Sequence, residues 1–154
     1  MQTEISIDVR ASPRTVFDRS RDIVSWPRML PHYRKVTIRS RNGTHVTADM
    51  RAVRAIGPVA VPVGWRSEHW SDDSDPGDLQ LRFVHVAGAT RGMDVTWHIR
   101  PANGGSRVTI KHDFRRHLPM LGDEIFPWLV DRFFVRPIAG RTLATFKQLA
   151  EATG

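Results

Sequence analysis

The chain opens with a strict alternation of apolar and polar residues. Over residues 3–9 the apolar side chains are Ile5, Ile7 and Val9, and a polar residue stands between each neighbouring pair. This period of two predicts a half-buried β-strand, with one face toward a core and the other toward water.

Two helix-start signals follow this strand. Ser12 is followed by a proline, and Ser25 is followed by tryptophan and proline. A serine side chain can cap the free N–H groups of a first helical turn, and proline is tolerated there because those N–H groups have no intrahelical partner. Two short helices are therefore expected within residues 13–30.

The stretch from residue 33 to residue 115 alternates between apolar strands and turns and shows no helical period. Turn signals rich in Asn, Asp, Gly or Pro stand at Asn42-Gly43, 75–78 and 103–105. The apolar-face residues between the turns are Val36, Ile38, Val46, Ala48, Met50, Leu79, Leu81, Phe83, His85, Met93, Val95, Trp97, Ile99, Val108, Ile110, His112 and Phe114. About six antiparallel strands are expected. Pro58 and Pro62 predict that the strand leading to Trp70 begins at an edge or a bulge.

The last apolar pattern has helical spacing. Ile125, Leu129 and Phe133 recur at every fourth residue, which is typical of one face of an α-helix. The pattern continues to Leu149, so we expect a helix over about residues 122–151, roughly 45 Å long at ~1.5 Å per residue. Pro137 should kink or restart this helix, because proline removes one backbone donor. The element order predicts an α+β fold with its helices on one face of an antiparallel sheet.

Composition limits the class of protein without naming its function. A length of 154 residues, with 40% hydrophobic and 25% charged residues, suits one globular domain over residues 1–154. No apolar run approaches the ~20 residues of a membrane span, and the N-terminus does not resemble a signal peptide, so we expect a cytoplasmic protein. The absence of cysteine excludes disulfides and sulfur-ligated zinc.

The charge balance raises the question of an anionic partner. The net charge is +7, and only Lys35, Lys111 and Lys147 among the basic residues are lysine. The arginines are scattered along the chain, as on solvated strand and helix faces, and no helix-turn-helix, zinc-finger or RNP-type pattern accompanies them. We therefore expect no nucleic-acid partner.

One segment carries a family resemblance. Residues 22–33 read DIVSWPRMLPHY and contain an Asp-Ile-x-x-Trp-Pro helix-loop motif, supported by the segments ASP at 11–13 and VTW at 95–97. With its element order, the chain resembles the START-like (SRPBCC) helix-grip superfamily, above all bacterial polyketide cyclase-like and quinone-binding members. The resemblance implies a curved antiparallel sheet of about seven strands wrapped around a long C-terminal helix, with a small hydrophobic ligand between them.

The resemblance also implies candidate catalytic residues. In aromatase/cyclases of this fold, a tyrosine soon after the Trp-Pro motif and an arginine on a central strand bind and steer a poly-β-ketone chain. Tyr33, the single tyrosine of the chain, matches the first. Trp70 stands where the arginine would fall, so Arg66 is the substitute candidate. Strand parity adds His112 as a third candidate for proton transfer.

Candidate ligand-binding residues come from parity and aromatic character. They are Trp26, Trp65, Trp70, Phe83, His85, Trp97 and Phe133. A tryptophan at such a site can equally be an ordinary core residue, and a histidine can be a hydrogen-bonded core or rim residue. No metal and no cofactor are expected, because the chain has no HExxH, P-loop, GxSxG or GxGxxG motif.

Two functions stay open at this point. The protein could be a cofactor-independent cyclase that promotes aldol condensation and dehydration of a polyketone, or a carrier of a lipid, quinone or similar hydrophobe. Docking of an acidic partner such as an acyl carrier protein is compatible with both, and the sequence does not set the oligomeric state. Prolines and a glycine between Leu118 and Phe134 predict that this segment controls entry to the cavity.

Overall fold

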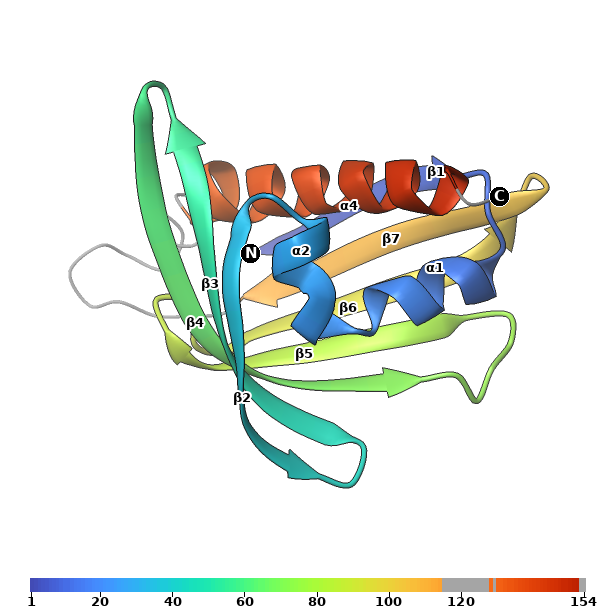
Figure 1. The fold of residues 1–154 in the computed structure, drawn as a ribbon, viewed down its shortest axis with the longest axis horizontal. Coiled ribbons are helices and arrows are strands. Elements are labelled where there is room, and N and C mark those ends of the chain that lie inside the picture. Colours follow the sequence, from blue (N-terminus) through green and yellow to red (C-terminus); the bar gives the residue numbers. More distant parts are fainter. Residues whose placement is uncertain (115–127, 129, 153–154) are drawn as a thin grey trace.

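Seven antiparallel strands form one curved sheet in the order β1-β7-β6-β5-β4-β3-β2 (Figure 1). The computed structural model describes residues 1–114, 128 and 130–152, without the side chain of Phe133. The strands are β1 (Gln2–Val9), β2 (Tyr33–Asn42), β3 (His45–Ile56), β4 (Val59–Asp72), β5 (Leu79–Gly88), β6 (Met93–Ala102) and β7 (Gly105–Phe114). The predicted seven-stranded α+β fold is confirmed.

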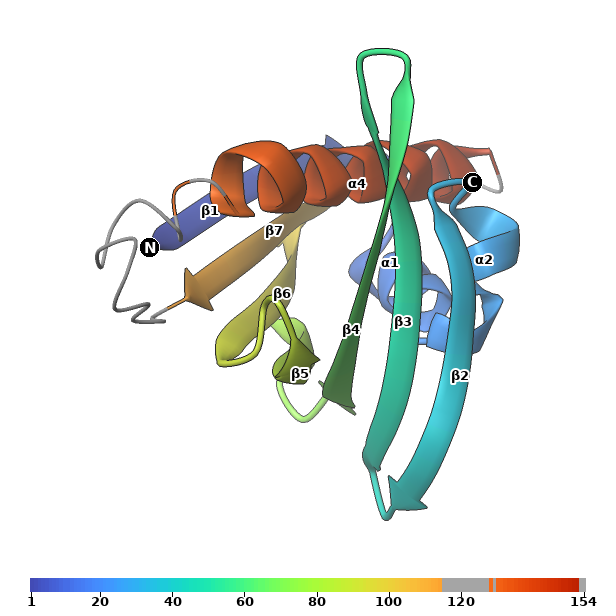
Figure 2. The ribbon, with the colours of Figure 1, turned by 90° about the vertical axis from the view of Figure 1, so that its left-hand side faces the viewer.

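The helices lie on the concave side of this sheet. They are α1 (Pro13–Ser20), the 3-10 turn η1 (Ile23–Ser25), α2 (Trp26–Met29), the π-helical turn η2 (Asp131–Val135) and α4 (Arg136–Glu151). In the side view the sheet bends around α4, while the β3–β4 hairpin rises past it (Figure 2). This is the helix-grip arrangement that the resemblance implied. None of the helices in the described part of the chain has the length and apolarity that a membrane crossing requires.

Only one of the two serine signals acts as a helix cap. The Ser12 side chain accepts a hydrogen bond from the backbone N–H of Thr15 at 3.2 Å, as predicted. Ser25 makes no such bond at the start of α2. Its hydroxyl donates to a carboxylate oxygen of Asp22 instead. Ser25 has helical φ and ψ values as the last residue of η1, and its oxygen accepts a hydrogen bond from the Arg28 guanidinium at 3.0 Å, so it does not serve as a cap.

The turns fall where the sequence places them. Gly43, at the predicted β2–β3 hairpin, has φ +59°, and Asn103 and Gly104 also have positive φ values between β6 and β7. Pro62 pairs with β3, but the β4–β5 pairing begins only at Trp65, so this end of β4 has a single neighbour. The predicted edge position is confirmed. Because no strand pairs with this side of β4 at Pro62, the lack of a proline N–H interrupts no hydrogen bond between strands there.

Register shifts help to explain why the sheet curves. One lies in the β4–β5 pairing between Arg66 and Ser67, and two lie in the β2–β3 pairing. A bulge inserts an extra residue in one strand and bends it. The bend opens space on the concave side, where side chains of β3 to β7 face the helices.

The C-terminal helix begins its regular part close to the predicted break. Residues 131–135 form the π-helical turn, and α4 starts at Arg136 with Pro137 in its first turn. Pro137 has no N–H to donate, and it stands just after the π-helical turn, as expected where a proline interrupts and restarts a helix. The earlier part of the predicted helix, at 122–127 and 129, lies outside the described residues.

Candidate ligand-binding site

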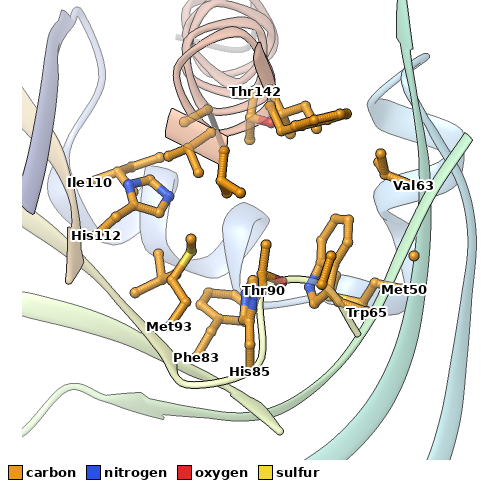
Figure 3. A pocket seen from close by; sticks show the side chains of 18 of the residues that line it. Met50, Val63, Trp65, Phe83, His85, Thr90, Met93, Ile110, His112 and Thr142 are labelled. Carbon is orange, nitrogen blue, oxygen red and sulfur yellow. Dashed lines mark hydrogen bonds between the residues drawn. The ribbon is translucent and has the colours of Figure 1, made fainter. Parts of the chain in front are cut away.

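A cavity of about 350 Å³ lies between the concave face of the sheet and the C-terminal helical segment (Figure 3). Strands β3 to β7 supply one wall, and residues of η2 and α4 supply the other. Its volume falls in the range of roughly 300–1,000 Å³ that is usual for small-molecule sites. A cavity of the predicted kind is therefore present.

Aromatic rings form one end of this cavity. Trp26 of α2 lies with its ring centroid 5.7 Å from that of Phe83 and 5.8 Å from that of Trp97, with nearly stacked planes in the second pair. The Trp26 indole N–H donates to the backbone oxygen of Ser20 at 3.0 Å, which holds the ring in place. Phe83 and Trp97 lie on adjacent strands, β5 and β6. The Trp-Pro motif thus places its tryptophan against the ligand wall.

A second aromatic contact lies where β4 and β5 meet. The rings of Trp65 and His85 stack with centroids 5.5 Å apart and planes at 19°. His85 Nδ1 and the Thr90 hydroxyl form a hydrogen bond of 2.7 Å. Because Thr90 also lines the cavity, this pair sets a polar group beside a flat apolar surface.

Burial keeps the cavity histidines uncharged. It lowers the pKa of His85 to about 3, with the nearby His112 adding to the effect. It also lowers the pKa of His112 to about 4, where the Asp131 carboxylate opposes the shift and Arg136 adds to it. Removing an imidazolium from water disfavours the charged form, so both rings are neutral at physiological pH. His112 Nδ1 is buried and has no hydrogen-bond partner among the described residues.

The charges beside His112 are paired with each other. The Asp131 carboxylate accepts hydrogen bonds from the Thr3 hydroxyl and from Arg136 Nε, each at 2.7 Å. These contacts tie η2 to β1. None of Thr3, Asp131 and Arg136 lines the cavity.

A further polar group meets the cavity at Tyr33. Burial raises the pKa of the Tyr33 phenol well above its ordinary range, and a hydrogen bond with the Thr142 side chain opposes the shift. Thr142 also shares a 2.8 Å hydrogen bond with His32 Nε2. Tyr33 is therefore a neutral phenol whose hydroxyl belongs to a buried network from β2 to α4.

The structure brings most of the predicted site residues together. Seven of the predicted residues line this cavity together: Tyr33, His112, Trp26, Trp65, Phe83, His85 and Trp97. They come from α2 and from strands β2, β4, β5, β6 and β7. The predicted ligand residue Phe133 has a side chain outside the described set.

The structure corrects the placement of Arg66 and Trp70. Successive residues of a strand point to opposite faces, and Trp65 faces the cavity, so Arg66 and Trp70 face outward. The Arg66 guanidinium makes a two-bonded pair with Asp49 at 2.6 and 3.2 Å. The Trp70 ring lies against that of His45, with ring centroids 4.6 Å apart and planes tilted by 34°. Neither Arg66 nor Trp70 contributes to the wall of this cavity.

Sequence reasoning missed several lining residues. Met50 and Met93 had the correct strand parity but were read as ordinary apolar-face residues. Thr90 lies in the turn between β5 and β6, and Thr142 is a polar residue on a helix, so neither carried a sequence signal. Ala139 supplies the small side chain that leaves room beneath α4.

Among residues 1–114, 128 and 130–152, no group of three or more His, Asp and Glu side chains is arranged to hold a metal ion.

Most of the predicted entry segment, at 118–127 and 129, lies outside the described residues. Trp128, within that segment, is exposed, with the Arg132 guanidinium 6.0 Å from its ring centroid.

Residues 1–151 match the protein family described as polyketide cyclase / dehydrase and lipid transport. A search of curated proteins finds no match. Among solved structures, TTHA0849 from Thermus thermophilus superposes with a TM-score of 0.79 at 20% identity, over 100% of this chain and 99% of that one.

Two other similar structures carry functional names. The Zhui aromatase/cyclase from a Streptomyces species has a TM-score of 0.77 at 16% identity, over 98% of this chain and 93% of that one. A STAR-related lipid transfer protein from Xanthomonas axonopodis has a TM-score of 0.67 at 16% identity, over 96% and 85% of the two chains. At these identities the likeness shows a shared fold.

Proposed function

This chain belongs to the polyketide cyclase / dehydrase and lipid transport family, and from that premise we propose that its cavity holds a flat aromatic molecule. Hydrophobic ligand binding follows from the family and the cavity together. The aromatic character of the ligand rests on one observation, which is the ring-lined wall formed by Trp26, Trp65, Phe83 and Trp97. Ring-to-ring contacts add about 0.5–1.5 kcal/mol beyond the area that they bury.

Binding of naphthalene and of its saturated counterpart decalin tests this proposal. Both have the same carbon skeleton, but only naphthalene is flat and aromatic. We expect naphthalene to bind about 3- to 10-fold more tightly, measured by quenching of tryptophan fluorescence and by calorimetry. Trp65→Leu should remove most of that preference. The matched control is Trp70→Leu, on the outer face of the same strand, which should keep it. Equal binding of the two probes to the wild type would contradict the aromatic ligand.

A second candidate function is catalysis of aldol cyclisation and dehydration in the same cavity. It is favoured by the presence of two neutral groups able to move protons, Tyr33 and His112, on the wall of one cavity. In a bound polyketone, neutral His112 would take a proton from the carbon between two carbonyls. The resulting enolate carbon would attack a ketone carbon, whose oxygen would take the Tyr33 proton. Loss of that hydroxyl together with a proton from the neighbouring carbon, as water, would leave a C=C bond in the closed ring, and return of the proton from His112 to Tyr33 would restore both groups.

Product profiles separate the catalyst from the carrier. The substrate is a polyketone presented on an acyl carrier protein, and the variants are Tyr33→Phe, His112→Ala and the outer-face control His45→Ala. If the protein is a cyclase, the first two variants should lower kcat by about 10²-fold or more while changing substrate binding less. If wild-type and variant proteins give the same spontaneous products at the same rate as a protein-free control, the protein is a carrier.

A further inference from the structure

The uncharged, hydrogen-bonding interior of the cavity limits which ligands it can accept. We propose that the cavity selects a neutral molecule carrying a hydroxyl or carbonyl oxygen and excludes carboxylate or phosphate analogues of the same shape. This inference rests on the proposed aromatic ligand and specifies its chemistry. A neutral phenol or ketone fits it, whereas a free fatty acid or an aromatic acid does not.

The described side chains that line the cavity are uncharged. Among the described residues that line the cavity there is no Asp, Glu, Lys or Arg, and the polar side chains are those of Thr90, Thr142, Tyr33, His85 and His112. An anion that enters loses its hydration and meets no cation among these lining residues. Burial of an unpaired charge costs far more than burial of a hydrogen-bonded hydroxyl.

The two cavity histidines do not supply a positive charge for an anionic ligand. His85 and His112 line the cavity as neutral rings, since burial lowers the pKa of each far below physiological pH. The nearby Arg136 is paired with Asp131. Its charge is therefore already matched by a carboxylate that belongs to the protein.

Polar side chains on the cavity wall can still form hydrogen bonds with a ligand. The His112 ring faces the cavity (Figure 3), whereas its Nδ1 is enclosed by protein and has no partner among the described residues. A ligand oxygen in the cavity can therefore meet this ring only at its other nitrogen, Nε2, which in a neutral imidazole either donates or accepts a hydrogen bond. The His85–Thr90 pair also keeps one hydrogen-bond donor or acceptor for a ligand. If His85 donates, the Thr90 hydroxyl can donate onward, and if Thr90 donates, its oxygen can still accept.

Four probes with one aromatic skeleton test this selection. They are naphthalene, 2-naphthol and 2-naphthoate at neutral pH, where the last is an anion, with 2-naphthamide as its uncharged isostere. We expect 2-naphthol to bind about 3- to 10-fold more tightly than naphthalene, as one added hydrogen bond allows. We expect 2-naphthamide to bind at least 10-fold more tightly than 2-naphthoate.

Variants then locate the effect. His112→Phe and Thr90→Val should each reduce the advantage of 2-naphthol over naphthalene, while binding of naphthalene itself reports that the variant is folded. The matched control His45→Phe changes a histidine on the outer face and should keep the full advantage.

Different outcomes contradict the aromatic ligand and the selection for neutral molecules. If naphthalene and decalin bind equally, or no probe binds, the aromatic ligand itself is wrong. If the aromatic probes bind but 2-naphthoate binds as tightly as 2-naphthamide, the aromatic ligand stands and the selection for neutral molecules is overturned. The wild-type comparison decides this even where a variant fails to fold.

Discussion

Burial decides the charge of individual histidines in this protein. It lowers the pKa of His32 to about 4, that of His112 to about 4 and that of His85 to about 3. No carboxylate forms an ion pair with these rings in the described part of the chain. At the residue scale the site therefore relies on neutral hydrogen-bonding groups, and its pH behaviour follows from that.

Stability should fall as the pH drops below the ordinary histidine range. The unfolded chain takes up a proton at each of these histidines near pH 6.5, whereas folded His112 does so only near pH 4. The stability that neutral His112 contributes is thus complete above about pH 6.5 and is lost as the pH falls toward 4. When the pH is lowered from about 7.5 to about 5, the free energy of unfolding of His112→Phe should fall by about 2 kcal/mol less than that of the wild type.

Chemical denaturation at the two pH values measures this difference. The control is Ile110→Val, on the same strand and also lining the cavity, where no titratable group is lost. It should lower stability by about 0.5–1.5 kcal/mol at both pH values and keep the wild-type dependence on pH. An unchanged dependence in His112→Phe would show that His112 is charged in the folded protein at about pH 5.

At the element scale, period and turn chemistry predicted most of the architecture. The inward parity of Phe83, Trp97 and His112 was correct because each lies in a strand with one buried face. Parity failed as a guide around β4, where Trp65 and Trp70 were both expected in the site although they lie on opposite faces. Spacing along one strand does not say which face meets the cavity, because that depends on how neighbouring strands pair and bend.

Two glycines should respond in opposite ways to alanine. In Gly105, at the start of β7, an added Cβ would clash with the backbone oxygen of Val9, so β1 would have to move. We expect Gly105→Ala to cost about 1–3 kcal/mol or more. In Gly140, within α4, an added Cβ would meet nothing within 4 Å. Gly140→Ala should stabilise the protein by about 0.5–1 kcal/mol, because alanine favours the helix.

Thermal unfolding of the two variants measures both signs at once. Each serves as the control for the other, since the same methyl group is added in both. A tolerated Gly105→Ala would mean that β1 can move away from β7 at little cost, and the close approach would then not constrain the sheet.

At the scale of the whole molecule, a bent sheet and a long helix enclose space that their own side chains do not fill. The sheet runs from β1, beside α4, around to β2 at its opposite edge (Figure 2). Small side chains on the facing helix preserve that space, and Ala139 is one of them. The cavity is therefore a property of the whole fold, and filling it from the helix should separate binding from folding.

Ala139→Phe should abolish binding of 2-naphthol and leave the fold intact. Ala139 is buried and lines the cavity from α4, so a phenyl ring at this position projects into space of about 350 Å³. Filling an existing void adds dispersion contacts, so stability should be unchanged or higher, whereas the ligand loses its place. The matched control is Ala144→Phe, on the exposed face of the same helix. Wild type and control should gain about 2.7 kcal/mol of stability at a ligand concentration of about 100 times Kd, and Ala139→Phe should gain almost none. If Ala139→Phe keeps wild-type affinity, the ligand binds elsewhere, because both cannot occupy the same cavity.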